Sequence, residues 1–441
     1  MTETQTVGIA LVGCGTVGSH VARLLLADAE LLTRRSGLAL ELRHVVDIDH
    51  AAARAAGADE CVCHGDLGRA LGDEQVHIVV ELVGGETFAK EVVSKSLAAG
   101  KNVVTANKAL LAACGGELFA AARSNGVCIG FGASCIGGVP VIGSLLNGLL
   151  ANDIDALFGI VNGTCNFILT SMSADGGDYA TVLAQAQADG LAEADPTLDV
   201  SGADSAHKLA ILASLAFGRR VDLDTIYTEG IDTVNVADIR YGAELGYTAK
   251  LLAIAVRQGE AVSLRVHPAF IRSDHPLAGV GGAFNAVCIY GHAVGHTMFY
   301  GRGAGGSATA SAVLADIIDV ATGNAKRRFD TLGIWPDIAP PADVLPMEQV
   351  RGRYYLHVTC QDSPGVLGSI ANALGRNNIS IASMIQHEPV PGASGVPLIF
   401  TTHEAVEGDV RAALGEINDL DVVGQPTVTI RIIAEHEETQ L

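Results

Sequence analysis

Gly13-Cys14-Gly15-Thr16-Val17-Gly18 is the stretch that decides the fold of the first part of the chain. An apolar run from Thr6 to Val12 precedes it and predicts a strand, and apolar residues at helical spacing follow it from Val17 to Leu25. Glycines between a strand and a helix permit a tight turn, a close approach of the backbone to a pyrophosphate, and close helix packing. The first turn of the helix, with Thr16 and Val17, then faces the anion. We therefore expect a dinucleotide site here, with a glycine-rich turn that binds nothing as the alternative.

The second predicted strand runs from Leu40 and ends at Asp47. An acid at this position accepts hydrogen bonds from ribose hydroxyls and repels a 2′-phosphate. The sequence therefore favours NAD over NADP, although either is compatible with the glycine motif. A solvated aspartate at a strand end is the alternative interpretation.

Strand and helix patterns alternate over residues 1–135. This order predicts an α/β domain with a doubly wound parallel sheet, a Rossmann domain, whose ligand groups lie at the carboxyl ends of its strands. Asn107 and Lys108 follow one such end. Later in the chain, Gly301-Arg302-Gly303-Ala304-Gly305-Gly306 precedes an apolar helix over Thr309–Val320. We expect Gly303 and Gly305 to approach the cofactor and residues 301–330 to complete the first domain; a flexible hinge is the competing interpretation.

The rest of the chain divides into three predicted regions. Residues 136–300 show longer helices and then strands that favour antiparallel pairing, which predicts an α+β domain for substrate binding and dimerisation. Residues 331–350 contain clustered prolines and form a predicted linker. Residues 351–441 follow a βαββαβ order, which predicts a ferredoxin-like unit. We expect the protein to form a homodimer or homotetramer.

One predicted helix carries charged residues although it is apolar on nearly all sides. Asp204, His207 and Lys208 share one of its faces, and we expect Ser201 to cap its start and Gly218 to end it. Such a helix is buried, and buried charged groups need partners or a ligand. A surface Asp–Lys pair is the alternative.

Acidic residues cluster in the loop before this helix, at Glu193, Asp195 and Asp199. Clustered acids repel one another, and a cation such as a substrate ammonium group relieves that repulsion. We therefore expect Glu193, Asp199 and Asp204 to contact the substrate. Lys208 and Lys108 supply the opposite charge, one to move the proton of a substrate hydroxyl and the other to hold a carboxylate or orient the cofactor. Together with a dinucleotide, these groups predict oxidation of an amino-alcohol.

Composition argues against several classes of partner. The 441 residues are 49% hydrophobic and 17% charged, enough for large cores, yet contain no apolar run of membrane-spanning length. A formal charge of −21 argues against nucleic-acid and anionic-membrane partners. The first residues do not read as a secretory signal, and nine scattered cysteines fit reduced thiols. We therefore expect a cytoplasmic protein that acts on a small molecule.

Several motifs follow one another along essentially the whole chain. They are Val104-Thr-Ala-Asn-Lys108, Gly137-Gly-Val-Pro140, Ile160-Val-Asn162-Gly-Thr164, Glu193-Ala-Asp-Pro196, Asp204-Ser-Ala-His-Lys208 and Gly301-Arg-Gly-Ala-Gly-Gly306. In this order they resemble the homoserine dehydrogenase family. The resemblance implies interconversion of L-homoserine and L-aspartate 4-semialdehyde with NAD or NADP, in threonine and methionine biosynthesis. It also implies Lys208 as the proton-transferring residue, Glu193 and Asp204 as substrate contacts, and Lys108 beside cofactor and substrate.

The last module resembles an ACT domain. Its run Asp362-Ser-Pro-Gly365-Val-Leu-Gly368, with Asn378-Ile-Ser-Ile381, matches the loop that senses amino acids in such domains. In homoserine dehydrogenases this implies feedback inhibition by L-threonine, with Asp362, Gly365 and Asn378 at the regulatory site. An oligomerisation module that has lost its ligand is the alternative.

Two positions depart from the family pattern. Gly132 stands where the family usually has a glutamate that helps to hold a monovalent cation. The backbone carbonyls of Cys135, Gly137 and Val139 remain as its possible ligands. The usual proline of the second glycine-rich run is Arg302, whose guanidinium near a cofactor phosphate would weaken the preference for NAD. Two other functions stay open on sequence alone: a dehydrogenase for a different amino or hydroxy acid, and an inactive amino-acid sensor.

Overall fold

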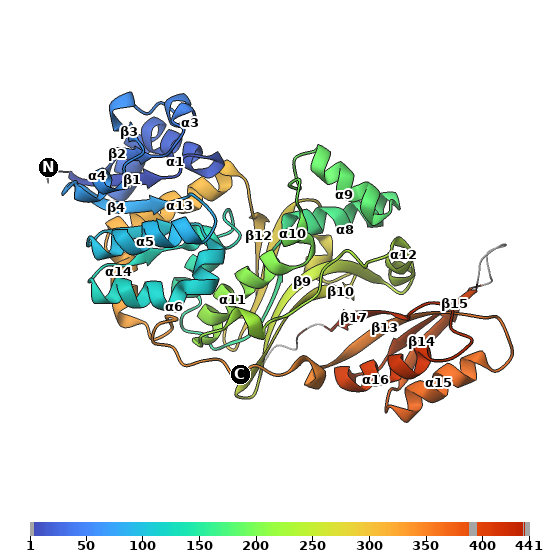
Figure 1. The fold of residues 1–441 in the computed structure, drawn as a ribbon. Coiled ribbons are helices and arrows are strands. Elements are labelled where there is room, and N and C mark those ends of the chain that lie inside the picture. Colours follow the sequence, from blue (N-terminus) through green and yellow to red (C-terminus); the bar gives the residue numbers. More distant parts are fainter. Residues whose placement is uncertain (1–3, 388–394, 435, 437–441) are drawn as a thin grey trace.

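The computed structural model describes residues 4–387, 395–434 and 436 (Figure 1). The outer ends of the predicted first and last regions, residues 1–3 and 437–441, lie outside this part. The first region contains a six-stranded parallel sheet in the order β3-β2-β1-β4-β5-β6. Its strands are β1 Gln5–Val12, β2 Leu38–Val46, β3 Cys63–His64, β4 Val76–Glu81, β5 Asn102–Thr105 and β6 Ile129–Gly130. The strand order reverses between β1 and β4, as in a doubly wound sheet, so the predicted Rossmann fold is confirmed.

Helices cover both faces of this sheet. They are α1 Thr16–Ala27, α2 Ala29–Ser36, α3 Ala51–Ala55, α4 Leu67–Gly72, α5 Thr87–Ala98, α6 Lys108–Ser124, α13 Gly306–Ala321 and α14 Asn324–Thr331. The predicted return of the helix after the second glycine-rich run is confirmed, because α13 packs against α1 and lies beside β4 (Figure 1). Gly306 permits this approach, since a Cβ atom there would lie 2.5 Å from Nδ1 of His20.

The second sheet has eleven strands within the described residues, nine of them in the order β12-β11-β7-β9-β10-β17-β13-β15-β14. Its central strands are β7 Ile154–Ile160, β8 Tyr227–Thr228, β9 Tyr247–Gln258, β10 Ala261–Arg272, β11 Phe284–Gly291 and β12 Gly295–Arg302. The helices of this region are α7 Val141–Gly143, α8 Gly163–Asp175, α9 Tyr179–Ala188, α10 Thr197–Val200, α11 Ala203–Phe217 and α12 Val236–Glu244. Strands β9 and β10 pair antiparallel, as their patterns predicted.

The last module has the predicted βαββαβ order and shares the second sheet. Its elements are β13 Arg351–Cys360, α15 Val366–Arg376, β14 Ile381–Gln386, β15 Val396–Thr402, β16 Ala405–Val406, α16 Glu407–Asn418 and β17 Val428–Ile433. Strand β17 pairs with β13 on one side and, in parallel, with β10 on the other. The sequence did not predict this continuity, because a strand pattern shows which residues face a core but not which strand lies beside it.

The segment that joins the two modules lies against the central sheet. The backbone N–H groups of Val262 and Arg220 donate to the carbonyls of Asp343 and Pro340. Trp335 is 3% exposed and stacks on Phe119 of α6. Among the helices that the structure describes, none has both the length and the apolar character needed to cross a membrane.

Candidate active site

The glycine-rich run lies at the start of α1. Gly13 has φ 89°, and a Cβ atom there would lie 2.7 Å from the backbone of Leu82 and Val83, so only glycine fits this turn. Gly18 packs directly on the carbonyl of Gly13. Nothing lies within 4 Å of the Cβ position of Gly15, which therefore leaves the N-terminus of α1 open. Thr16 and Val17 form the first turn of this helix.

Asp47 follows β2 and turns into the same loop. Its Oδ2 accepts a hydrogen bond from the N–H of Cys14 at 2.5 Å, and its Oδ1 accepts one from Ile48 at 2.7 Å. Burial, together with the charge of Asp47, raises the pKa of the Cys14 thiol to about 11. The carboxylate is therefore held beside the glycine run and Cys14 stays protonated at neutral pH.

Asp204 lies between two lysines that come from different parts of the fold. Its Oδ2 is 2.6 Å from Nζ of Lys208, one turn further along α11, and its Oδ1 is 3.2 Å from Nζ of Lys108, the first residue of α6. Asp204 is only 4% exposed. Burial raises the pKa of its carboxyl, but the two lysine charges outweigh that effect and hold the pKa below its ordinary value. Asp204 is thus a carboxylate that connects α11 to α6.

Asn162 connects the two predicted substrate acids, a role that the sequence analysis did not assign. Its Nδ2 donates to Oδ1 of Asp199 at 2.7 Å and to Oδ2 of Asp204 at 2.8 Å. Its Oδ1 caps α8 by accepting from the N–H of Cys165. Nζ of Lys208 also donates to the carbonyl of Val161 at 2.6 Å. An asparagine before a helix signals a cap, but nothing in the sequence signals the two carboxylates.

The predicted cluster of acids is only partly assembled. Asp199 joins Asp204 through Asn162, whereas Asp195 accepts hydrogen bonds from the N–H and hydroxyl groups of Thr197, which lower the pKa of its carboxyl. The Glu193 side chain is exposed, and its backbone carbonyl accepts from Nε2 of Gln187. A local turn thus satisfies the carboxylate of Asp195, whereas the roles of Glu193 and Asp199 at the substrate stay predictions.

Helix α11 begins differently from the prediction and ends as predicted. Gly202, with φ 85°, is the N-cap and no side chain caps the helix; Oγ of Ser201 is 3.4 Å from the N–H of Ala203. Gly218, with φ 60°, ends the helix. The prediction of a Ser201 cap was wrong because the chain turns into the helix through a left-handed residue. Beside Lys208, the buried Nδ1 of His207 has no hydrogen-bond partner among the described residues.

A buried glutamate behind Lys108 was also missed. Glu81 ends β4 with no exposed surface, accepts from Oγ1 of Thr105 at 2.6 Å and from the N–H of Val83 at 2.9 Å. Burial raises the pKa of its carboxyl. Oγ1 of Thr105 in turn accepts from the N–H of Asn107, the residue before Lys108. A glutamate at the end of a largely apolar strand was the signal that could have revealed this support.

The loop after β6 explains why residue 132 is a glycine. A Cβ atom at Gly132 would lie 2.7 Å from Oδ1 of Asp316, a residue of α13 whose carboxylate accepts from the N–H of Ala133 at 3.1 Å. Burial raises the pKa of Asp316 to about 7. The carbonyl of Val139 accepts from Val141 at 2.8 Å. No cluster of three or more His, Cys, Asp or Glu side chains suited to a metal occurs among the described residues.

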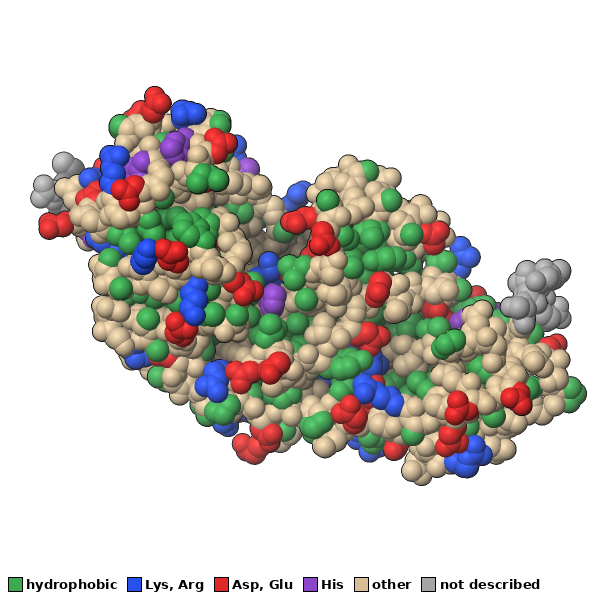
Figure 2. Space-filling model, viewed as in Figure 1, with side chains coloured by type: hydrophobic (Ala, Val, Ile, Leu, Met, Phe, Trp, Pro, Cys, Tyr) green, Lys and Arg blue, Asp and Glu red, His purple; other side chains and the backbone are tan. Residues whose placement is uncertain are grey.

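The second glycine-rich run, residues 301–306, precedes α13, the helix that packs against α1. Gly303 lies so close to Asn285 that no Cβ atom fits, and Gly305, with φ 110°, precedes α13 and has open space around it. The exposed guanidinium of Arg302 lies over the ring of Phe284 at 5.8 Å. The space-filling view shows a hollow between the region of α1 and α5 and that of α8 and α9, with basic and histidine side chains inside it (Figure 2).

The predicted regulatory residues do not lie together. Gly365, with φ 95°, begins α15, and Asp362 lies in the exposed loop before it. Asn378, with φ 59°, follows the other end of this helix. Eleven residues of helix separate the two ends by about 16 Å. Gly365 and Asn378 of one chain therefore flank opposite ends of α15, and the assignment of Asp362, Gly365 and Asn378 to a regulatory site stays a prediction.

Comparisons with known proteins give one consistent result. Family models match at residues 13–131 (homoserine dehydrogenase, NAD binding domain), 140–318 (homoserine dehydrogenase) and 354–422 (ACT domain). A homoserine dehydrogenase of Pseudomonas aeruginosa is 42% identical over 97% of this chain and 99% of its own, and one of Corynebacterium glutamicum is 41% identical over 97% and 96%.

Solved structures agree. The crystal structure of a homoserine dehydrogenase from Thiobacillus denitrificans is 41% identical and covers 99% of both chains with a TM-score of 0.91. A hyperthermophilic archaeal homoserine dehydrogenase in complex with NADPH is 27% identical and covers 72% of this chain and 98% of its own with a TM-score of 0.60.

Proposed function

The chain belongs to the homoserine dehydrogenase family and is an NAD(P)-dependent oxidoreductase that acts on a CH–OH group in amino-acid biosynthesis, and from this premise we propose how its own residues perform the reaction. One observation carries the proposal. Asp204 is a buried carboxylate that pairs with Lys208 on its own helix, α11, and with Lys108 at the start of α6. The dinucleotide crevice and the substrate helix therefore meet at these three charges.

Lys208 is the residue that moves the proton. In the oxidation of L-homoserine, the deprotonated form of Lys208 takes the hydroxyl proton while a hydride leaves the carbon that bears this hydroxyl. In the reverse direction, a hydride adds to the carbonyl carbon and the protonated form of Lys208 gives its proton to the carbonyl oxygen. A bound nicotinamide supplies the acceptor or donor of the hydride. Asp204 and the carbonyl of Val161 orient Nζ of Lys208. Lys108 stands beside cofactor and substrate, where Glu81 and Thr105 hold the loop that precedes it.

Acidic residues recognise the substrate ammonium group. Asp199 and Asp204 share Asn162, so their carboxylates form the fixed part of this site. Glu193, which is exposed on the loop before α10, approaches the ammonium group when substrate is bound. Paired charges of this kind orient an amino acid so that its hydroxyl-bearing carbon faces the crevice.

NAD is the preferred dinucleotide, and Asp47 is the residue that selects it. Gly13, Gly15, Thr16, Val17 and Gly18 receive the pyrophosphate at the start of α1, and Gly303 and Gly305 approach from the other side. The residues present fit a monovalent cation only in part. The carbonyls of Cys135, Gly137 and Val139 are its candidate ligands, but Gly132 provides no carboxylate and the carboxylate of Asp316 binds backbone N–H groups instead.

L-Threonine is the effector of the ACT domain. The loop from Asp362 to Gly365 opens a helix whose first N–H groups can bind a carboxylate. Asn378 can reach the same ligand only from a second copy of the chain, which agrees with a homodimer or homotetramer. We also propose a cytoplasmic location, because all nine cysteines are free thiols, as is usual in a reducing compartment.

Absorbance of the reduced cofactor tests this function. We expect L-homoserine to reduce NAD faster than NADP, and L-threonine to slow the reaction. The same assay with other amino and hydroxy acids tests whether another substrate is preferred. If the enzyme turns over one of these compounds faster, that compound and not L-homoserine is the preferred substrate.

A further inference from the structure

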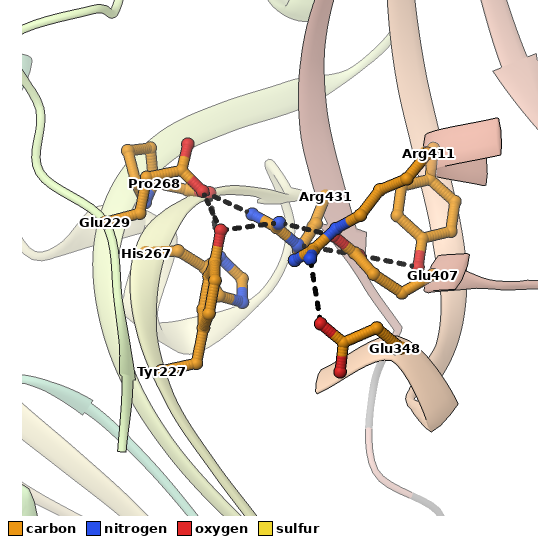
Figure 3. A network of polar contacts seen from close by, with 9 residues as sticks. Tyr227, Glu229, His267, Pro268, Glu348, Glu407, Arg411 and Arg431 are labelled. Atoms are coloured by element: carbon orange, nitrogen blue, oxygen red, sulfur yellow. Dashed lines mark hydrogen bonds and ion pairs between the residues drawn. The ribbon is translucent and has the colours of Figure 1, made fainter. Parts of the chain in front are cut away.

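A buried ionic cluster joins the ACT module to the rest of the protein. Arg431 lies on β17, opposite Ala269 of β10 in the parallel pairing of these strands. Its Nη1 is 2.7 Å from Oε2 of Glu229, and its Nη2 donates to the hydroxyl of Tyr227 at 3.2 Å. Figure 3 shows Arg431 between Tyr227 and Glu229 on one side and Glu407 on the other. The guanidinium of Arg431 therefore connects the module to β8 and to the residue that follows it.

The guanidinium of Arg431 has a fixed position within its own module. Glu407, the first residue of α16, accepts from its Nε at 3.0 Å and from its Nη2 at 2.7 Å. Arg431 is 7% exposed and Glu407 is 2% exposed. Burial lowers the pKa of Arg431, but Glu407 outweighs that effect and raises the pKa above its ordinary value, so the side chain stays charged. Any shift of the module therefore moves this charge relative to Glu229.

The backbone of Glu229 lies against the segment that carries Asp199. We call this segment, residues 195–202 with the short helix α10, the substrate loop. The next residue is Gly230, where a Cβ atom would lie 2.8 Å from Cα of Ser201 and closer still to the carbonyl of Val200. The N–H of Ile231 donates to that same carbonyl at 2.8 Å. No side chain fits between the two segments, so their backbones are in direct contact.

The substrate loop ends at the lysine–carboxylate centre. Oδ1 of Asp199 accepts from Nδ2 of Asn162, and the same amide group donates to Asp204. A displacement at residues 229–231 changes where Asp199 lies relative to Asp204. From Arg431 to Asp204 the contacts form one continuous series of hydrogen bonds and closely packed backbone.

We propose that Glu229 is a positioning residue for the substrate loop, and that Arg431 of the ACT module holds it in place. The inference rests on the proposed role of Asp199 at the substrate. An effector can inhibit only by binding one arrangement of the protein better than another. Movement of Arg431 away from Glu229 is the difference between two such arrangements that would weaken substrate binding and leave the cofactor site unchanged.

The test uses the full-length enzyme with Glu229→Gln, which keeps the size of the side chain and removes its charge. We expect the KM for L-homoserine to rise about three- to tenfold, while kcat and the Kd for NAD stay within about twofold of the wild type. Threonine should inhibit this variant less, because the ion pair that it would break is already lost. Glu229→Asp, which restores the charge, should recover part of the affinity.

Glu348→Gln is the matched control. Glu348 pairs with Arg411 at the exposed edge of the same cluster and has no contact with residues 229–231 among the described contacts. An equal rise in KM for both variants, or no change in the Glu229→Gln enzyme, would overturn the proposal. If Glu229→Gln does not fold, Tyr227→Phe removes the hydrogen bond that the Tyr227 hydroxyl donates to Glu229 and the one that it accepts from Arg431, and should give the same change more weakly.

The experiment also separates this inference from the proposed regulation. A wild-type enzyme that threonine does not inhibit would contradict the choice of effector. The KM of the Glu229→Gln enzyme would still decide whether Glu229 positions the substrate loop.

Discussion

Nζ of Lys108 lies 3.2 Å from Oδ1 of Asp204, although Lys108 is the first residue of α6 and Asp204 lies in the first turn of α11, in another region of the chain. The contact connects the helix after β5 to the helix that carries Lys208. Since Asp204 binds Lys208 with its other oxygen, one buried carboxylate arranges both lysines. The following predictions test what these groups and their neighbours do.

Replacement of Lys208 by alanine should abolish most of the turnover. Loss of a general acid–base costs about 10²–10⁴ in rate, and NAD binding should survive because Lys108 still neutralises Asp204. Steady-state rates and fluorescence titration with NADH check both parts. Lys326→Ala, which removes an ion pair on the surface of α14, is the control. Near-normal turnover of the Lys208→Ala enzyme would show that another group moves the proton.

Glu193→Gln should raise the KM for L-homoserine much more than the KM for NAD. The substitution keeps the shape of the side chain but removes the charge that meets the ammonium group. Asp195→Asn is the matched control, because the carboxylate of Asp195 already accepts hydrogen bonds from Thr197. Equal changes in both Michaelis constants would indicate a structural role for Glu193.

Asp47→Ser should shift the ratio of kcat/KM for NAD and NADP toward NADP. The serine removes the repulsion between the carboxylate and a 2′-phosphate. Asp49→Ser is the control, since the carboxylate of Asp49 caps its own turn by accepting from Ala51. A wild-type enzyme that prefers NADP strongly would contradict the role of Asp47 and draw attention to Arg302.

Gly365→Leu should remove threonine inhibition without loss of basal activity. Gly365 has a left-handed backbone at the start of α15, so a leucine strains the loop and fills it. Calorimetry of threonine binding is the measurement, with Gly415→Ala on α16 as the control. Unchanged threonine binding in the leucine variant would place the regulatory site elsewhere.

Lys250 should make the stability of the protein depend on pH above 8. The side chain is 2% exposed and donates to Oδ1 of Asn166 and to the carbonyl of Val280, and burial lowers its pKa to about 8. Between pH 8 and the unfolded pKa of about 10.4, the unfolded chain binds more protons, so stability rises with pH.

The difference between wild type and Lys250→Met isolates this effect. The wild type should gain up to about 3 kcal/mol relative to the variant between pH 8 and pH 10.5. Thermal unfolding of both proteins across this range is the measurement. A constant difference in Tm would show that Lys250 has an ordinary pKa in the folded state.

The continuous sheet also changes how regulation is best tested. Removal of residues after Val350 would take β17 away from β10 and expose the apolar edge from Ala269 to Ile271. We therefore expect the shortened protein to be less stable than the full chain. Point substitutions in the intact protein are the cleaner experiment.

Local patterns in the sequence determined the fold of each region. Glycines at 13, 15 and 18 between a strand and a helix predicted the Rossmann sheet, and the βαββαβ order of the last module followed from periodicity. The lysines and Asp204 could be recognised because a charge on an apolar helix requires a partner. All of these signals arise within a few turns of chain.

Only the tertiary structure decided which distant groups meet. It gave Asp204 two lysines, joined Asp199 to Asp204 through Asn162, and placed β17 beside β10. It also separated Asn378 from Gly365 and turned Asp195 toward Thr197. Hydrogen bonds and ion pairs act over about 3 Å in space, whereas sequence patterns report only the local period of the chain, so contacts between residues far apart in sequence leave no local trace.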